Sequence, residues 1–141
     1  MQREVNGSML DKSKPFGQLV QERRTELSIS MRKFAEKIGI GVAYQSDIEY
    51  GTRNVPENDV LDKIIAALRL TQDEERDLYD VAAAGRGERT IPQDIPNYIR
   101  ANPHVVVALR TAKDAGAEEK DWQRFIEEMN RKKSEKAEGD S

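Results

Sequence analysis

The stretch SMRKFAEKIGIGVAYQSDIEYG, residues 30–51, decides the fold of this chain. It holds two short segments of helical apolar period, 31–38 and 42–50, separated by a glycine-containing turn. Helices joined so tightly must cross at a steep angle, which requires a small residue at their closest approach, glycine at the turn and apolar residues facing the core. The residues that meet these requirements are Ala35, Gly39, Ile40, Ile48 and Gly51.

Apolar residues at helical spacing continue on both sides of this pair. Before it, the apolar residues of 16–27 share one helical face. After it, residues 60–68 carry a wide apolar stripe, and Thr71 with Glu74 has the spacing of a capping box that opens a fifth helix. Five short helices joined by brief connections predict one compact all-α bundle over residues 15–85.

The flanking segments differ from this bundle in composition. Residues 1–14 are predicted to be a flexible tail, 86–93 a linker, and 132–141 a charged, disordered tail. Residues 94–131 show three further helical patterns. Because so short a region buries too little surface to be stable alone, it is expected to pack on the first domain, on a second copy or on another partner. Trp122 and Phe125 are its expected anchors.

Composition excludes several classes of protein. The 141 residues include 35% charged and 37% hydrophobic residues and carry a net charge of −3. This charge weighs against DNA binding through bulk positive charge, but not against a local cluster of arginines and lysines. There is no cysteine, no apolar run of the roughly 18 residues of a membrane helix and no signal-peptide pattern. We therefore expect a cytoplasmic protein with no membrane contact.

Catalysis has no support in the sequence. His104 is the only histidine, and it stands beside Pro103 without a partner at metal-ligand spacing. No glycine-rich phosphate loop, no second histidine and no cysteine are present. We expect no enzyme activity, no metal and no cofactor.

Residues 16–84 resemble the phage-repressor family of helix-turn-helix domains (Cro/CI or Xre type). The family pattern begins with Leu-Ser-Gln and continues with Ala, a Gly-x-Ser turn, an Ile-Glu-x-Gly ending and a basic turn before proline. The corresponding residues of this chain, in the same order, are Ile29-Ser30-Met31, Ala35, Gly39-Ile40-Gly41, Ile48-Glu49-Tyr50-Gly51 and Arg53-Asn54-Val55-Pro56. The resemblance implies an all-α, five-helix lambda-repressor-like bundle followed by a short helical C-terminal region. It also implies a sequence-specific transcriptional regulator, a repressor acting as a homodimer, with the helix at 42–50 in the major groove of double-stranded DNA.

Family positions that contact bases correspond to Val42, Ala43 and Asp47, and side-chain chemistry adds Gln45 and Ser46. Methyl groups of Val42 and Ala43 suit thymine, whereas Asp47 suits the cytosine N4 donor. The predicted phosphate contacts are Arg23, Arg32, Lys33, Tyr44, Arg53 and Asn54. For Arg23 and Arg24 an ordinary solvated surface is the alternative, and Glu49 is expected to pair internally with a residue such as Arg24.

Three departures from the family pattern favour an alternative function. Met31 stands where a glutamine usually bonds phosphate, Gly41 where a serine caps the second helix, and Gln45 where an apolar residue is usual. With the acidic net charge they favour a protein-interaction module on a helix-turn-helix scaffold, such as an antitoxin-like protein. Residues 91–112, IPQDIPNYIRANPHVVVALRTA, resemble the tails of regulators that a metallopeptidase inactivates, which implies a docking site for such a protease or another protein.

Overall fold

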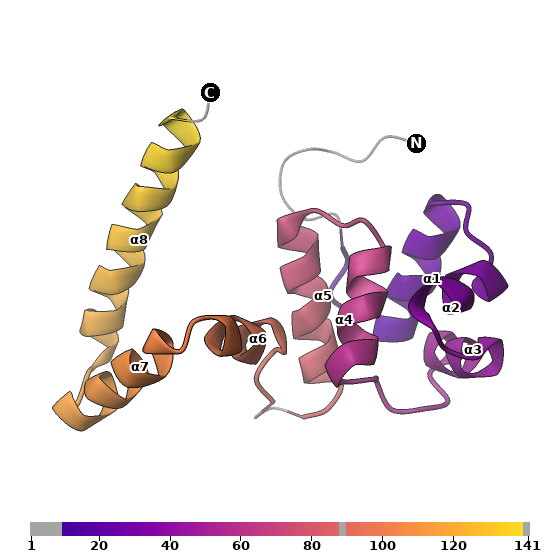
Figure 1. Ribbon diagram of the computed structural model, residues 1–141, viewed down its shortest axis with the longest axis horizontal. Coiled ribbons are helices and arrows are strands. Elements are labelled where there is room, and N and C mark those ends of the chain that lie inside the picture. Colours follow the sequence, from indigo (N-terminus) through magenta and orange to yellow (C-terminus); the bar gives the residue numbers. More distant parts are fainter. Residues whose placement is uncertain (1–9, 88–89, 140–141) are drawn as a thin grey trace. The chain divides into compact units, whose positions relative to one another are not determined.

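The computed structural model describes residues 10–87 and 90–139, and all regular structure within these ranges is α-helical (Figure 1). The helices of these ranges are α1 (Phe16–Glu26), α2 (Met31–Ile38), α3 (Val42–Tyr50), α4 (Asn58–Ala67), α5 (Gln72–Ala84), α6 (Asp94–Ala101), α7 (His104–Ala115) and α8 (Glu119–Gly139). The chain divides into a first unit, Met1–Tyr98, and a second unit, Ile99–Ser141. The predicted all-α class is confirmed.

Helices α1 to α5 of the first unit enclose one apolar core. Helix α1 packs against α3 and α5, and α2 packs against α3 and α4. The core residues are Phe16, Leu19, Val20, Phe34, Ile38, Ile48, Leu61, Ile64, Ile65, Ala67, Leu68, Leu78, Val81 and Ala82. They come from all five helices, so burial of their apolar surface holds the helices together. The predicted five-helix bundle is confirmed, and further helices follow it.

Local side-chain bonds set where two of these helices begin. The Ser30 hydroxyl accepts a hydrogen bond from the Lys33 N–H at 3.1 Å and caps α2. At α5 the Thr71 hydroxyl accepts from the Glu74 N–H, and the Glu74 carboxylate accepts from the Thr71 N–H at 3.0 Å. The capping box predicted from the sequence is therefore confirmed.

One glycine allows α1 to approach the end of α3 closely. A Cβ atom added at Gly17 would lie 2.2 Å from the Ile48 carbonyl oxygen and 2.6 Å from that of Glu49. Backbone atoms cannot yield as the end of a flexible side chain can, so only glycine fits here. Sequence analysis did not single out Gly17, because nothing near it in the chain reveals this contact.

The start of α6 is fastened to the first unit by polar side chains. The Gln93 amide donates to the Asn58 carbonyl at 2.7 Å and accepts from the Asn58 N–H at 2.8 Å. The Oδ1 atom of Asp62 accepts from Tyr79 at 2.7 Å, Gln93 at 2.9 Å and Asn97 at 3.0 Å. The end of the segment predicted as a linker, 86–93, is therefore bound to α4.

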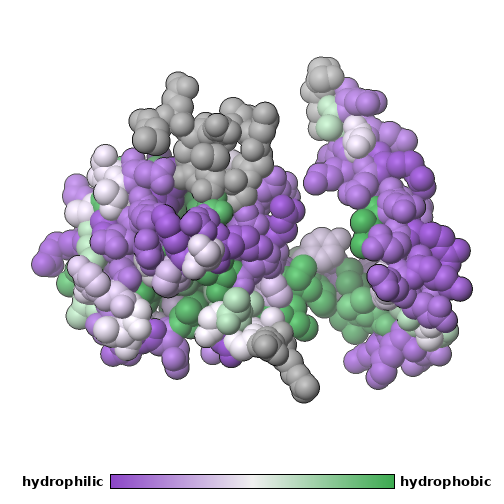
Figure 2. Space-filling model, turned by 180° about the vertical axis from the view of Figure 1, so that it is seen from behind, coloured by the Kyte–Doolittle hydropathy of each residue, from purple (hydrophilic) through white to green (hydrophobic). Residues whose placement is uncertain are grey.

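The second unit lacks a comparable core. None of the described residues of α7 and α8 is buried. The same holds for α6, which begins in the first unit and ends in the second. Trp122 and Phe125 are 39% and 52% exposed, and their rings meet edge to face with centroids 6.3 Å apart. Figure 2 shows apolar side chains gathered on the surface of this unit. Its helices form without burying the apolar residues that their sequences supply.

The two predicted terminal tails lie partly within the described residues. Helix α8 continues to Gly139, so the prediction of disorder from residue 132 is wrong for 132–139. That segment is rich in Glu, Lys, Arg and Ala, which are strong helix formers and extend a helix already begun. At the other end, Lys12 pairs with Asp80 at 3.2 Å and Lys14 with Glu22 at 3.0 Å. The rest of the predicted flexible tail, residues 1–9, lies outside the described residues.

Among helices of the described ranges, none combines the length and apolar character needed to cross a bilayer.

Candidate nucleic-acid interface

Helices α2 and α3 pack against each other across a short turn, as the sequence predicts. Gly39 ends α2 in the left-handed conformation, with φ of 78°, and Gly51 ends α3 in the same way, with φ of 74°. Ala35 is buried, Ile40 packs against the core, and Ile48 points inward from α3. One side of α3 is thus held in the core while its other side faces solvent.

The solvent-facing side of α3 is a single stripe of residues. Ala43, Ser46, Asp47 and Tyr50 follow one another at i, i+3, i+4 and i+7, which places them on one helical face. Of these four, Ala43 and Tyr50 are exposed and Ser46 and Asp47 are half-buried, as is Val42 at the start of the helix. Tyr50, whose exposed fraction is 69%, was missed by sequence analysis. Its spacing from Ala43 and Asp47 places it on the same helical face, and this spacing could have identified it from the sequence.

Gln45, predicted to contact bases, requires a correction. Its side chain is fully buried, and its Nε2 atom donates to Glu49 Oε2 at 2.7 Å. Residue 45 lies one turn before Ile48 and Glu49, on the side of α3 that faces the core. A side chain enclosed in this way cannot reach a base edge, so the prediction for Gln45 is wrong.

A buried ion pair ties α3 to α1. Arg24 donates from Nε and Nη2 to the two carboxylate oxygens of Glu49, each at 2.8 Å, and from Nη1 to the Ile29 carbonyl at 2.8 Å. Hydrogen bonding to the Glu49 carboxylate raises the pKa of Arg24, so its charge is secure. The predicted internal pairing of Glu49 is confirmed. Together with Gln45, this network fixes the rotation of α3 about its axis.

Arg23 also requires a correction. Its Nε atom donates to the Leu68 carbonyl and its Nη2 atom to the Arg69 carbonyl, both at 2.9 Å. These carbonyls lie at the end of α4, where helix geometry leaves them without partners inside the helix. The Arg23 guanidinium therefore caps α4. The prediction that it contacts phosphate is wrong, because these bonds hold it against the bundle.

Most of the remaining predicted phosphate contacts precede or follow α3 along the chain, and Tyr44 lies within it. Arg32 and Lys33 are exposed at the start of α2, and Arg53 and Asn54 are exposed in the turn after α3. Tyr44 is half-buried beside that turn, and the Arg53 guanidinium lies 5.3 Å from the centre of its ring. Along the chain, Arg32 and Lys33 thus precede the exposed stripe of α3, and Arg53 follows it.

Asp47 is in direct contact with this turn. Its Oδ2 atom accepts from Arg53 Nε at 3.1 Å, and its Oδ1 atom accepts from Thr52 Oγ1 at 3.2 Å. A predicted base contact and a predicted phosphate contact are therefore paired with each other.

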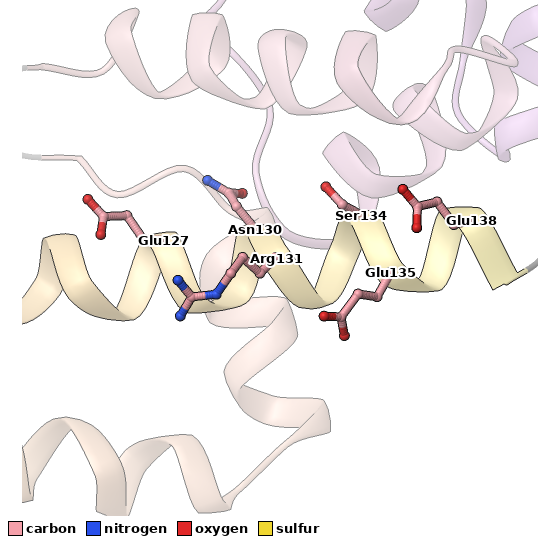
Figure 3. Close-up of a pocket in the computed structure, with 6 residues that line it drawn as sticks. All are labelled: Glu127, Asn130, Arg131, Ser134, Glu135 and Glu138. Atoms are coloured by element: carbon pink, nitrogen blue, oxygen red, sulfur yellow. The ribbon is translucent and has the colours of Figure 1, made fainter.

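A surface depression on α8 does not offer an alternative site. Its lining residues all belong to this one helix, and Figure 3 shows them on more than one side of it. They are Glu127, Asn130, Arg131, Ser134, Glu135 and Glu138. Such an arrangement does not enclose a ligand. Within residues 10–87 and 90–139, no group of three or more His, Cys, Asp or Glu side chains is arranged to hold a metal ion.

Residues 20–74, which include the whole of α2, α3 and α4, match the helix-turn-helix family HTH_3. The resemblance to the Cro/CI or Xre type is thereby confirmed over these residues. An HTH_3 domain is a DNA-binding domain and is typically non-catalytic.

Comparison with solved structures finds the "SINR PROTEIN/SINI PROTEIN COMPLEX". The matching chain is 23% identical, and the alignment covers 84% of this chain and 98% of that one with a TM-score of 0.43. Similarity at this level does not assign a function or a partner. No curated protein matches the chain.

Proposed function

We propose that the protein is a sequence-specific transcriptional regulator, a repressor that binds double-stranded DNA as a homodimer with α3 in the major groove. The observation that carries the proposal is the exposed stripe of α3 within an HTH_3 domain, flanked by the exposed cations of α2 and of the following turn. The major groove admits one α-helix, and phosphate contacts on both sides would fix its position. A protein so bound at a promoter blocks polymerase, and such a regulator acts in the cytoplasm.

Within this proposal, base contacts come from the exposed side of α3. The residues assigned to them are Val42, Ala43, Ser46, Asp47 and Tyr50, of which Tyr50 is added on the basis of its exposure. Phosphate contacts are assigned to Arg32, Lys33, Tyr44, Arg53 and Asn54. Small side chains dominate the base-facing set, so a single subunit would discriminate weakly. Two subunits on half-sites about 34 Å apart would multiply both affinity and discrimination.

Dimerisation is assigned to residues 94–131. What supports this assignment is the set of exposed apolar side chains on α7 and α8, which include Leu109, Trp122, Phe125 and Ile126. A face of this kind is stable only when it is covered. A different protein, including a regulatory metallopeptidase, is the alternative occupant.

The test is a selection from random duplexes with the full-length protein, followed by affinity measurements on the enriched sequence. Arg32→Ala should weaken binding to all sequences alike and lower the salt slope by about one. Lys63→Ala, which removes an exposed cation of α4, is the matched control. It should leave both the affinity for DNA and the salt slope unchanged. Ser46→Ala should instead alter preference among sequences. Failure to enrich any sequence would contradict the proposal.

A protein-interaction module with weak DNA binding is the second candidate. The net charge of −3, Met31 in place of a phosphate-bonding residue, and Asp47 on the exposed stripe favour it. The same selection separates the two candidates, because an interaction module would lose all binding when non-specific competitor DNA is added at modest salt.

A further inference from the structure

An exposed carboxylate on the helix that faces DNA is unexpected, because phosphates repel it. Asp47 lies in the middle of the exposed stripe of α3, and its negative charge is balanced by Arg53 at 3.1 Å. Both side chains are open to solvent, with exposed fractions of 41% and 62%. The pair therefore lies at the surface that would meet DNA, and neither partner is locked by packing.

The Arg53 side chain has two partners on the protein, and both are weak. An exposed ion pair contributes about 0–1 kcal/mol. A cation over an exposed aromatic ring, as Arg53 lies over Tyr44, contributes about 0.5–1 kcal/mol. A phosphate can displace these partners, but a phosphate that takes Arg53 leaves the Asp47 carboxylate beside DNA without its counter-charge.

We propose that Asp47 is a specificity-determining residue that withholds Arg53 from DNA lacking the correct sequence. On such DNA, release of Arg53 to a phosphate exposes an uncompensated carboxylate, so Arg53 stays paired. On DNA that presents a cytosine N4 amino group to Asp47, the carboxylate gains a new donor and Arg53 is released to the backbone. The exchange couples a base contact to a phosphate contact. This inference rests on the proposed DNA-binding function.

The first unit contains a matched control pair. Asp73 and Arg76 on α5 also lie 3.1 Å apart, with exposed fractions of 43% and 56%. Replacing either aspartate by asparagine changes the net charge equally and preserves the side-chain shape. Only Asp47 lies on the proposed interface. A difference in DNA affinity between the two variants is therefore due to the position of the lost charge and not to the change in total charge.

The experiment measures the affinity of the full-length protein for a random-sequence duplex and for the selected duplex over a range of salt concentrations. Asp47→Asn should tighten binding to the random duplex by about three- to tenfold and steepen its salt slope by about one, since one more cation meets phosphate. Discrimination between the two duplexes should fall correspondingly. Asp73→Asn should change affinity by less than about twofold, because a distant surface charge is largely screened.

The Arg53→Ala variant separates release of Arg53 from simple repulsion of the carboxylate. For the wild-type protein the salt slope should be steeper by about one on the selected duplex than on the random duplex, since Arg53 meets phosphate only on the selected one. Arg53→Ala should abolish this difference, because no cation remains to be released. A difference that persists in Arg53→Ala, or equal gains from Asp47→Asn and Asp73→Asn, would overturn the inference while leaving the proposed function intact. A wild-type protein that bound neither duplex would overturn the proposed function and this inference with it. Circular dichroism verifies that each variant is folded.

Discussion

The two units of this chain are built from the same kind of element but bury their apolar side chains very differently. In the first unit Val20, Phe34, Ile64 and Leu68 are completely enclosed. In the second, described residues as large as Trp122 remain partly exposed. Apolar residues at helical spacing are therefore enough to predict helices in both units. They produce a core only where several helices turn their apolar sides toward one another.

The difference also concerns polar groups. The first unit buries the Arg24–Glu49 pair and uses it to hold α3, whereas the described ion pairs of α8 are exposed. Burial makes the loss of one partner costly to the stability of the fold, because the remaining charge has neither water nor a counter-charge beside it. The first unit consequently holds α3 in a defined orientation, whereas the second exposes apolar side chains on its surface.

The largest expected effect is the loss of the buried pair. Glu49→Ala should lower the free energy of unfolding by about 3–5 kcal/mol, because Arg24 is left charged and enclosed. Glu22→Ala, which removes the partner of the half-buried Lys14, should cost less than about 1 kcal/mol. Urea unfolding followed by circular dichroism measures both. Equal losses would show that burial does not distinguish the two pairs.

The second prediction tests whether the second unit contributes to the core. Replacing Trp122 and Phe125 together by alanine should change the free energy of unfolding of the monomer by less than about 0.5 kcal/mol. Phe34→Ala should lower it by about 3–5 kcal/mol. In sedimentation experiments the double variant should dissociate to monomers at concentrations where the wild-type protein is dimeric. A variant that remains dimeric would place the dimer contact elsewhere.

The smallest effect is expected at the start of α6. Burial raises the pKa of the Asp94 carboxyl, the nearby charge of Asp80 raises it further, and Arg76 opposes the change. The folded state thus holds this proton more tightly than the unfolded chain. The contribution of Asp94 to stability is therefore largest below the ordinary aspartate pKa of about 3.9 and falls as the pH rises through the folded-state pKa.

Asp94→Asn removes this titration. The variant should be more stable than the wild-type protein at pH 7, by less than about 1 kcal/mol, and the difference should vanish toward pH 3. Thermal unfolding at a series of pH values measures it. Asp59→Asn, at an exposed position of α4, serves as the control. A difference between wild type and the Asp94 variant that grew as the pH fell would contradict the assigned direction.

Much of the fold follows from the sequence alone because its signals are local. The Ser30 cap and the Thr71–Glu74 box join residues three positions apart. The turn at Gly39 depends on its own backbone conformation. Interactions of this range form in the same way wherever the helix is placed. The sequence of residues 15–85 therefore determined the helices, their order and the helix-turn-helix pair.

Only the tertiary structure decided which side chains remain available at the site. Arg23 is held by carbonyls 45 and 46 positions away, and Gly17 is required by backbone more than thirty residues along the chain. Gln45 is enclosed because α3 turns that side toward the core. The Asp47–Arg53 pair depends on how the turn after α3 folds back. Residue type and spacing determine what a side chain can bind. Burial, and partners distant in sequence, determine whether that side chain is available to bind it.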